Sequence, residues 1–525
     1  MEFGLPRRTR PRNGVQDGMA TRRILIRAGR PPHDTTSNEG AVAWGPWGHF
    51  AGNAGNMVFS DSVYETLNVP GAEITCDAYA PERYDLTQRD ADEVNERYDV
   101  YAIPLANAFR NDYAEGPLVR LTSFIEKLRI PVVVVGVGGQ GAIGKGAAGL
   151  SPRAQENVRR FVAAVLERSH SIGLRGESTR GMLAELGFSE PDVDVIGCPS
   201  LYRMGRDFAV ERRVERITAD SPLAVNLESK LPIAADFYRA NEAAYSDLVS
   251  VFQTLYGAEL LLWGTEMPRA FTAGTPTSIS HPAYREGRIR FFTNPRSWRD
   301  FLADRDFSFG TRIHGNITAL TAGTPAFVLT TDLRTQELVD YHGIPHARFD
   351  ETVRSGRYLA ADLYERADYA DFNARMPGNW DHYHAFLESN GLAHIHEEGN
   401  AHPEYATRLA DAAATPGIVP VSAAHTPEIA TRLSWLWQGR AADRDRPTGG
   451  YRPEFPLDRT DAQSLRQQLD RVTGQLAEQR AANAELEARL DARLAELEAF
   501  KSYLNRPVGA RVRSAIARRL PGGRG

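Results

Sequence analysis

Short apolar runs alternate with amphipathic stretches along the chain from about residue 22 to residue 350. Several runs are nearly unbroken, as in Val132–Val135, which is typical of parallel strands covered on both faces. Regular alternation of such strands with helices indicates an α/β fold with an open, doubly wound sheet. In the first part of the chain we expect strands in RRILIRAG, AEITCDAY, YDVYAIPL, PVVVVGVGG, SIGLRG and VDVIGCPS.

The same pattern restarts after about residue 205. A helix is expected from about Ala234 to Tyr256, and later helices in PRSWRDFLADR, from Ile317 onward and in RTQELVDYHG. The strands expected between them are SPLAVNLES, AELLLWGT, FSFGTR and PAFVLT. Two successive sets predict two Rossmann-like domains that face each other, at residues 21–205 and 206–357. Ligands of such sheets bind beyond the carboxyl ends of the strands, so the expected site is a cleft between the domains.

Different patterns flank these two domains. Residues 1–20 are rich in arginine but lack the apolar segment of a secretory signal, so we expect a disordered leader, with Met19 as a possible natural start. Residues 358–440 predict a helical and irregular extension, and residues 441–462 a linker rich in proline, glycine and charge.

Residues 463–505 place leucines at heptad spacing, which predicts a coiled coil and a homo-oligomer. Gln479 and Asn483 interrupt the seam, and polar seam residues can fix register and strand number. The alternative is one amphipathic helix that packs on its own domain. The basic tail at residues 506–525 fits peripheral contact with an anionic membrane surface, or an unstructured, solvated end. The apolar seam positions include Leu465, Leu469, Val472, Leu476, Leu486, Leu490 and Leu497.

Composition narrows the class of protein. A hydrophobic fraction of 42%, a charged fraction of 25% and a net charge of −5 fit a globular protein and argue against a nucleic-acid partner. The two cysteines, Cys76 and Cys198, form no disulfide framework, which favours a reducing compartment. No apolar run reaches the length of about 18 residues that a transmembrane helix needs. We expect a cytoplasmic protein, with the inner face of the membrane as the alternative place.

The stretch FSFGTRIHGNITALT puts two ionisable side chains where a buried strand meets a helix. Arg312 can hold a carboxylate or phosphate by two parallel hydrogen bonds. Gly315 and Asn316 open the helix, whose free amides also favour an anion. His314 lies between them. An unperturbed histidine has a pKa of about 6.5, which suits proton transfer. The alternative is structural: a histidine bonded to a carbonyl, and an arginine paired with Asp304 or Asp306.

Other strand ends show a similar pattern. Arg175 ends a strand in SIGLRGEST, and glycine turns follow the strands in VVGVGGQG and VIGCPS. The first loop, WGPWGHFAGNAGN, matches neither G-x-G-x-x-G nor the Walker pattern, so no nucleotide cofactor is expected. The pairs at His382–His384 and His394–His396 have a spacing that suits a strand and lack a nearby third ligand, so no metal is expected.

Taken together, these stretches resemble the polysaccharide pyruvyl transferase family. The resemblance covers roughly residues 40–350 and is most specific in RIHGNITALTAGTPAFVLTTDLRTQELVDYHGIP. It implies two domains arranged as in GT-B glycosyltransferases. It also implies transfer of the enolpyruvyl group of phosphoenolpyruvate to a saccharide, free or lipid-linked, usually as a ketal. The stretches are GNAGNMVFSDSVYETL, LANAFR, VVVVGVGGQG, IGLRGESTRGMLAELG, VIGCPSLY and RIHGNITALTAGTPAFVLTTDLRTQELVDYHGIP.

The resemblance also assigns roles to residues. His314, in the family's Arg-x-His motif, matches its proton donor, while Arg312 and Arg175 match its substrate-binding arginines. The complete set expected to bind substrate is Arg175, Arg312, Asn53, Asn56, Gly315 and Asn316.

One position departs from the family pattern. Members often carry an acid in the first glycine loop, where this chain has Gly55-Asn56, and an amide cannot remove a proton from a hydroxyl. The general base would then be Asp61, Glu228 or Asp332, or His314 would serve both steps, or the donor or acceptor differs. Two other functions stay open: a GT-B glycosyltransferase that uses a nucleotide sugar, and a non-catalytic scaffold assembled by the coiled coil.

Overall fold

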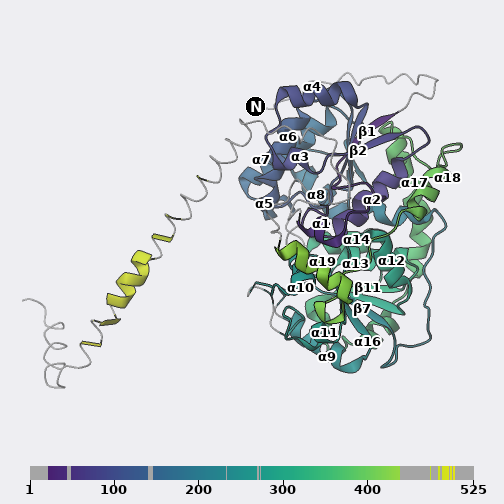
Figure 1. Cartoon of the computed structure of the whole chain (residues 1–525). Coiled ribbons are helices and arrows are strands. Elements are labelled where there is room, and N and C mark those ends of the chain that lie inside the picture. The colour runs from purple at the N-terminus through teal and green to yellow at the C-terminus, as the bar shows by residue number, and fades with distance from the viewer. Residues whose placement is uncertain are drawn as a thin grey trace, which may run out of the picture. The chain divides into compact units, whose positions relative to one another are not determined.

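The computed structural model describes residues 22–43, 49–139, 146–231, 233–268, 271 and 274–437, together with separate helical positions between residues 473 and 502 (Figure 1). The chain divides into two compact units, Met1–Leu457 and Asp458–Gly525. The first unit contains every strand of the described residues, and the site discussed below lies within it.

The first sheet is parallel, with the strand order β2-β1-β3-β4. A parallel bridge between Val137 and Leu174 continues it toward the pair β5-β6. This order is that of flavodoxin-like sheets, in which the direction of winding reverses between β1 and β3. A crevice is therefore expected beyond these two strands. The bounds are β1 Arg23–Ile26, β2 Glu73–Cys76, β3 Val100–Pro104, β4 Val132–Val135, β5 Ile172–Leu174 and β6 Val193–Val195.

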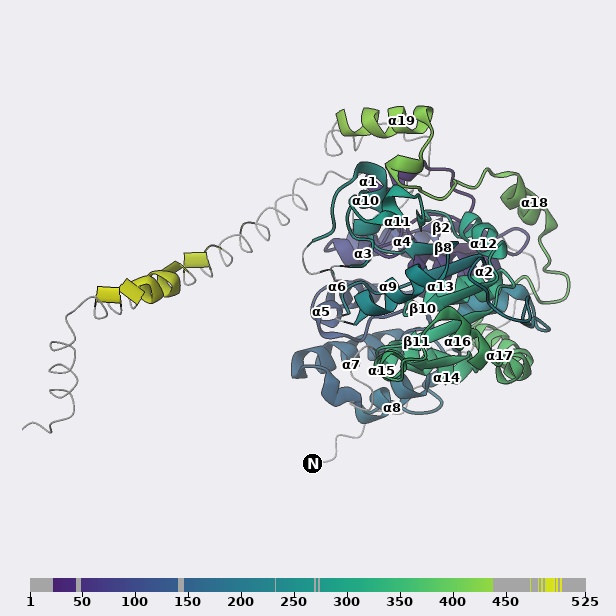
Figure 2. The same ribbon diagram turned by 90° about the horizontal axis from the view of Figure 1, so that it is seen from below.

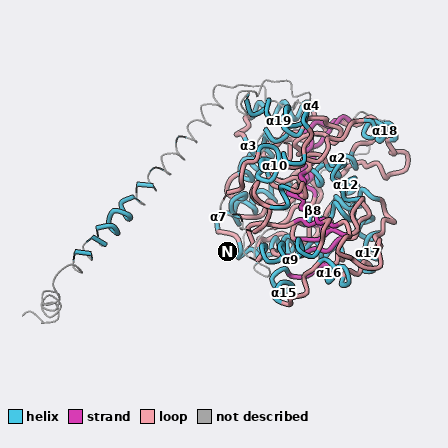
Figure 3. Tube along the Cα trace, turned by 60° about the horizontal axis from the view of Figure 1, so that its bottom comes forward, coloured by secondary structure: helices cyan, strands magenta, loops and turns pink. Residues whose placement is uncertain are grey.

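The second sheet is also parallel, with six strands in the order β12-β11-β10-β7-β8-β9. Counted from β7, this is the Rossmann order 3-2-1-4-5-6 reversed, and its winding changes direction between β7 and β10. Figure 3 shows the strands inside and the helices outside. The α/β prediction with parallel sheets is confirmed. The bounds are β7 Leu223–Asn226, β8 Leu248–Phe252, β9 Ile289–Phe291, β10 Phe307–Gly310, β11 Ala326–Thr330 and β12 His346–Arg348.

Helices connect the strands of both sheets. Those of the first part are α1 Asn38–Ala43, α2 Gly55–Leu67, α3 Ala80–Arg83, α4 Gln88–Arg97, α5 Asn111–Ala114, α6 Pro117–Ile125, α7 Pro152–Leu166 and α8 Glu177–Glu185. Those of the second are α9 Ala234–Ala244, α10 Leu255–Trp263, α11 Pro282–Arg285, α12 Pro295–Ala303, α13 Ile313–Thr321, α14 Leu333–His342 and α15 Phe349–Arg354. The extension adds α16 Ala360–Arg366, α17 Ala370–Ser389, α18 Pro403–Asp411 and α19 Thr426–Trp437, and 3₁₀ turns are η1 Gly146–Gly149, η2 Pro199–Met204 and η3 Val421–Ala423.

Local sequence signals explain where several helices begin. Ser151 accepts a hydrogen bond from the amide of Ala154, and Pro152 occupies the first helical position of α7. Thr87 and Asp90 form a reciprocal capping box at the start of α4. Asp332 caps α14, which ends at Gly343 in the left-handed conformation.

One expected helix and one expected strand were wrong. The predicted helix from Ala234 to Tyr256 ends at Ala244, and Leu248–Phe252 forms strand β8. The run AELLLW, predicted as a strand, belongs to helix α10. A short apolar run fits either element, and composition decides here: LVSVF contains β-branched valines, whereas AELLLW consists mostly of strong helix formers.

Helices that follow the strands bring the two sheets together. Helix α13, which follows β10, packs against α2 and η2 of the first part, and α14 packs against α8. The carboxyl ends of strands from both sheets therefore approach one another. From the extension, α17 contacts α14 and η2, and α19 lies on α10 (Figure 2).

The remaining predictions on organisation are not tested by the fold. The boundaries at residues 205 and 357 stay predictions, and the leader, linker and basic tail lie outside the described residues. In the predicted coiled coil the described positions are helical, and Leu490, Leu494 and Leu497 are exposed. No helix in the described part of the chain is both long and apolar enough to cross a membrane.

Candidate active site

A strained turn joins β10 to α13 at the point where the second sheet reverses its winding. Gly310 has a φ of 141°, a conformation that L side chains rarely adopt. A Cβ atom at this position would lie 2.1 Å from the carbonyl oxygen of Asn226, at the end of β7. The amides of Thr311 and Arg312 donate to that same carbonyl. Glycine is thus required here to hold the turn close to β7.

Two buried amides stabilise this turn from inside. The side chains of Asn226 and Asn316 hydrogen-bond each other in both directions, at 2.9 and 3.2 Å. Asn316 also donates to the carbonyl of Gly310 and is 0% exposed. Asn316, expected to bind substrate, is therefore occupied by internal bonds. Gly315 has a packing role, since a Cβ there would lie 2.6 Å from Gln253 Nε2.

Arg312 occupies the N-cap position of α13, and its side chain forms an ion pair. Its Nη2 lies 2.5 Å from Oε2 of Glu228, and both side chains are mostly buried. This partner differs from Asp304 and Asp306, which the structural alternative proposed. Burial lowers the pKa of Arg312, and the charge of Glu228 opposes that shift. The guanidinium thus reaches the site with one carboxylate already beside it.

His314 lies in the first turn of α13, against the other part of the molecule. A Cβ added to Gly55, at the start of α2, would be 2.8 Å from the imidazole Nδ1. The ring centroid lies 6.2 Å from that of Phe59, and the Sγ of Cys198 lies 3.9 Å from Nε2. Burial, followed by the charges of Arg175 and Arg334, lowers the pKa of His314 to about 3. The imidazole is therefore neutral near pH 7 in the ligand-free protein.

Arg175 is completely buried, at 0% exposure, directly after β5. Among the residues that the structure describes, its Nε, Nη1 and Nη2 atoms have no hydrogen-bond partner. Its Cδ atom would lie 3.0 Å from a Cβ at Gly138, so the glycine turn after β4 provides its space. Buried polar groups are nearly always hydrogen-bonded, and a guanidinium has five donors. This arginine is thus prepared for an anion.

Glu337 and Arg334, which sequence reasoning missed, complete the cluster. Glu337 of α14 accepts hydrogen bonds from the amide and the hydroxyl of Thr179, at 2.8–3.0 Å. Burial raises the pKa of Glu337 to about 7, and Arg175 opposes this shift. Nη2 of Arg334 lies 3.3 Å from Oδ2 of Asp332. The buried Nε of Arg334 has no hydrogen-bond partner among the described residues. Arg334 is close enough to lower the pKa values of His314, Arg312 and Arg175.

The first glycine loop joins this cluster to a cavity. Oδ1 of Asn53 accepts a hydrogen bond from the backbone amide of Gly55, and the side-chain Nδ2 of Asn56 donates to the carbonyls of Phe50 and Ala51. Both side chains thus shape the start of α2. Asn56 also lines a cavity of about 300 Å³ beyond β1 and β3, where the first sheet reverses its winding. Its other lining residues are Arg27, Ala51, Gly52, Leu105, Ala106, Asn107, Arg110, Asp112, Tyr113 and Pro117.

The three expected general bases lie in different surroundings. Asp61 is buried beside Arg30, with Oδ2 3.2 Å from Nη2, and burial raises its pKa to about 6. Glu228 pairs with Arg312, and Asp332 caps α14 beside Arg334. Glu228 and Asp332 therefore lie in the arginine cluster, whereas Asp61 belongs to a separate ion pair.

The arrangement has a defined chemical capacity. Arg175, Arg312 and Arg334 surround a neutral imidazole, and the nearby carboxylates are paired, capping or partly protonated. Guanidinium groups bind carboxylates and phosphates with planar, paired hydrogen bonds. An imidazole in such a site can transfer a proton. The site can thus bind a small anion and protonate it.

Comparison with known proteins identifies the class to which this site belongs. The model of the polysaccharide pyruvyl transferase family matches residues 53–332, which include all seven predicted site residues. The chain belongs to the polysaccharide pyruvyl transferase family and is a transferase. Family membership implies a saccharide acceptor and an activated pyruvyl donor. No curated protein sequence matches the chain.

Solved structures give only weak likenesses. UDP-GlcNAc 2-epimerase from Neisseria meningitidis, bound to UDP-GlcNAc, is 10% identical, with 70% of this chain and 100% of that chain covered and a TM-score of 0.37. The UDP-GlcNAc 2-epimerase of Methanocaldococcus jannaschii, in complex with UDP-GlcNAc and UDP, is 10% identical over 70% and 99%, with a TM-score of 0.35. These TM-scores are low, and the fold follows from the strand orders of the two parallel sheets.

The lone guanidinium predicts an unusual effect on stability. Replacing Arg175 with methionine removes an unpaired buried charge, and an unsatisfied buried polar group costs about 1–3 kcal/mol. We expect Arg175→Met to raise the midpoint of thermal unfolding, measured by scanning calorimetry at pH 6. At that pH the carboxyl of Glu337, with its pKa of about 7, is mostly protonated and keeps its bonds to Thr179.

Arg27→Met is the matched control. Arg27 is also buried, but it forms two hydrogen bonds to Glu82, at 2.5 and 3.2 Å, and one to the carbonyl of Pro104. Its loss leaves a buried carboxylate without its cation and costs about 3–5 kcal/mol. A decrease for Arg175→Met as large as that for Arg27→Met would show that Arg175 is paired in solution.

Proposed function

We propose that the protein transfers the enolpyruvyl group of phosphoenolpyruvate to a saccharide and forms a pyruvate ketal in glycan biosynthesis. The single observation behind this proposal is the buried Arg175, whose donors are unpaired beside His314. A site built for a neutral sugar would not bury an unpaired cation.

The donor fits the charge of the cluster. Phosphoenolpyruvate carries a carboxylate and a phosphate on adjacent atoms of a small skeleton. In the proposed complex Arg175 binds one of these groups. Arg334 and Arg312 bind the other, and Arg312 stays oriented by Glu228 at 2.5 Å. Each charge-assisted hydrogen bond contributes about 1.5–3 kcal/mol.

Binding of the donor also prepares the acid. In the free protein, burial and two guanidinium groups keep the pKa of His314 at about 3. The negative charges of the donor offset those of Arg175 and Arg334, so the pKa of His314 rises in the complex. The imidazole then takes up a proton as the donor binds.

The reaction follows in three steps. The imidazolium of His314 gives its proton to C3 of the donor, which makes C2 electrophilic. A sugar hydroxyl adds to C2, the bond from C2 to the phosphate oxygen breaks, and phosphate leaves. A second hydroxyl adds to C2 and closes the ketal. Of the two hydroxyl protons, one returns to the neutral imidazole and the other leaves with phosphate. In this scheme His314 serves both steps, which accounts for Asn56 in place of an acid.

We place the acceptor in the cavity beyond β1 and β3. Asn56 lines this cavity, and the preceding Gly55 packs against His314, so the two sites share the first turn of α2. Arg110 and Asp112 supply polar groups for sugar hydroxyls, and Leu105 and Pro117 supply apolar surface.

The proposed acid gives a direct kinetic test. His314→Asn removes proton transfer but keeps a polar side chain of similar reach. We expect kcat to fall by about 10²–10⁴, because a positioned acid contributes that factor. Phosphate release from phosphoenolpyruvate, with a panel of free and lipid-linked saccharides, measures it. Near-normal kcat in a folded variant would contradict the assignment.

The same variant tests proton uptake. Titration calorimetry in two buffers of different ionisation enthalpy counts the protons bound with phosphoenolpyruvate at pH 7. Because the complex holds a proton that the free protein lacks, affinity rises as the pH falls. The proton uptake due to His314 should disappear in His314→Asn. Subtracting the uptake of this variant from that of the wild type removes the protons taken up by the phosphate group of the donor. Stabilisation by UDP-sugars but not by phosphoenolpyruvate would instead favour a glycosyltransferase.

The acceptor cavity gives a second kinetic test. Arg110 lies at its edge, with Nε 2.9 Å from Oδ1 of Asp112. We expect Arg110→Ala to raise KM for the saccharide about tenfold and to leave KM for phosphoenolpyruvate unchanged, since one hydrogen bond to a charged group is lost. Arg159→Ala, at an exposed arginine of α7, is the control. Equal effects on both substrates would contradict separate positions for donor and acceptor.

We also propose that residues 463–505 assemble copies of the chain. Leu490, Leu494 and Leu497 are 57%, 54% and 58% exposed and lie on one helical face, which a second copy would cover. Deleting unit Asp458–Gly525 should lower the mass in solution to that of one chain, measured by light scattering, with turnover retained. A truncated protein that contains as many chains as the full-length protein would refute this assembly. Contact of the basic tail with a membrane stays a prediction.

A further inference from the structure

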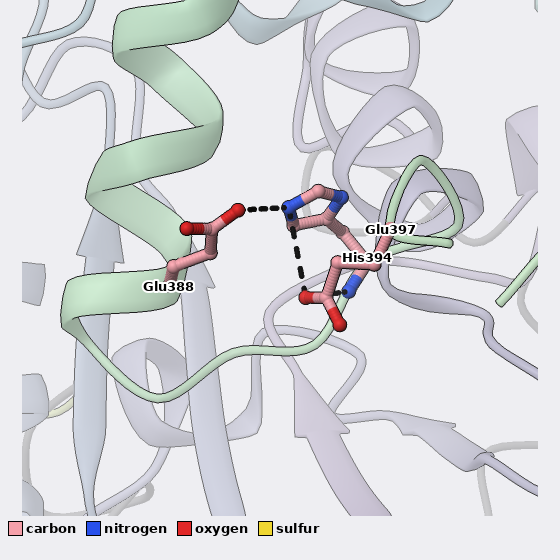
Figure 4. Close-up of side chains that lie close together, drawn as sticks. All are labelled: Glu388, His394 and Glu397. Atoms are coloured by element: carbon pink, nitrogen blue, oxygen red, sulfur yellow. Dashed lines mark hydrogen bonds and ion pairs between the residues drawn. The ribbon is translucent and has the colours of Figure 1, made fainter. Parts of the chain in front are cut away.

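The end of α17 and the segment after it bring three potential metal ligands together (Figure 4). Nε2 of His394 lies 3.3 Å from Oε1 of Glu388 and 3.6 Å from Oε1 of Glu397. All three atoms lie within 4.8 Å of one another. Glu388 comes from the last turn of the helix, whereas His394 and Glu397 come from the segment that follows. The pair His394–His396 was expected to lack a nearby third ligand, and Glu388 comes close only because the chain turns back at Gly391.

The local backbone fixes this geometry. Gly391, with a φ of 70°, ends α17, and the amide of Leu392 returns a hydrogen bond to Leu387. The side chain of Glu397 is oriented by two bonds, from the amide of His394 to Oε1 at 3.2 Å and from Nδ2 of Asn400 to Oε2 at 2.8 Å. Outer bonds of this kind hold metal-ligating carboxylates in place.

The two distances from Nε2 of His394, at 3.3 and 3.6 Å, are long for a charge-assisted hydrogen bond and close to the separation of two ligands on one small ion. Charge-assisted hydrogen bonds from nitrogen to a carboxylate are about 2.7–2.9 Å long. A tetrahedral ion with bonds of about 2.0–2.1 Å separates its ligand atoms by about 3.3–3.4 Å. His394 is buried, with a side chain 3% exposed, whereas Glu388 is 59% exposed and leaves an approach from solvent.

Further imidazoles surround this group. The ring centroids of His384 and His396 lie 4.5 and 6.2 Å from that of His394. Nε2 of His384, Nε2 of His396 and Nδ1 of His394 are buried and have no hydrogen-bond partner within the described ranges. Arg22 is close enough to be affected by the charge of Glu397, but its hydrogen bond goes to the carbonyl of Gly391. Unpartnered imidazole nitrogens beside carboxylates are typical of sites for transition metals.

We propose that Glu388, His394 and Glu397 bind a divalent transition-metal ion of the zinc type, with water completing its coordination. The ion has a structural role, because it joins α17 to the segment at residues 390–402. That segment is bonded to the end of α2, through the amide of Ile395 to Thr66 and through Nδ1 of His402 to the carbonyl of Asn68, both at 2.8–2.9 Å. The ion thereby holds the extension on the first sheet and its helices.

Direct binding of zinc to the full-length, tag-free protein tests this site. After treatment with a chelator and dialysis, we expect one equivalent of Zn²⁺ to bind, measured by titration calorimetry and metal analysis. The midpoint of thermal unfolding should rise by several degrees, because an ion that binds only the folded state stabilises it. Glu388→Gln and Glu397→Gln should each weaken binding at least tenfold.

Glu398→Gln is the matched control, at an exposed neighbour outside the group, and should bind zinc like the wild type. Glu388→Gln avoids a folding defect, since that side chain is mostly exposed. Absence of stoichiometric zinc, or equal affinity in Glu388→Gln, would overturn the proposal and leave an ion-pair cluster only. Turnover by Glu388→Gln should equal that of the wild type, so this result is independent of the proposed transfer reaction.

Discussion

A buried guanidinium without a partner is the constraint on which the site depends. Arg175 has lost its hydration at 0% exposure and has gained no hydrogen bond from the described part of the chain in exchange. Such a group destabilises the ligand-free protein, and the surrounding fold must offset that cost. Gly138 and Gly176 make the room, and Thr179 holds Glu337 nearby as a carboxyl whose pKa is raised to about 7. In the proposed complex, an anion would offset this cost by accepting hydrogen bonds from the guanidinium.

The two reversals of winding explain why the site lies where it does. In the second sheet, β7 and β10 are neighbours whose outgoing connections separate at the reversal, and Asn226 and Gly310 hold the turn that presents Arg312 and His314. In the first sheet, the connections that leave β1 and β3 line a cavity of about 300 Å³. Helix α2 lies between these places, with Gly55 against the imidazole and Asn56 on the cavity wall. One helix start thus lies between the cavity of the first sheet and the turn that follows β10 of the second sheet.

Much of this could be predicted from the sequence, for a physical reason. A charged residue after a buried strand has few structural uses, so position and the family resemblance together could single out Arg175, Arg312 and His314 as candidates. Glu337 was not, because its partner Thr179 is 158 residues away and nothing local marks the pair. Arg334 looked like an ordinary residue of a helix start. Asn316 of α13 was expected to bind substrate, but its side chain is hydrogen-bonded to that of Asn226 at the end of β7. The run AELLLW shows a similar limit, since periodicity alone cannot separate a buried helix from a strand.

The contact between Gly55 and His314 has a consequence for the proton affinity of the imidazole. The imidazole loses water because a glycine from the other part of the molecule covers it, with no side chain between them. Separation of α2 from α13 would rehydrate the ring and return its affinity for protons toward that of free histidine. Closing the same contact around a protonated ring would lower its pKa and favour release of the proton. In the proposed reaction, this contact would therefore help to move the proton from the ring to C3 of the donor.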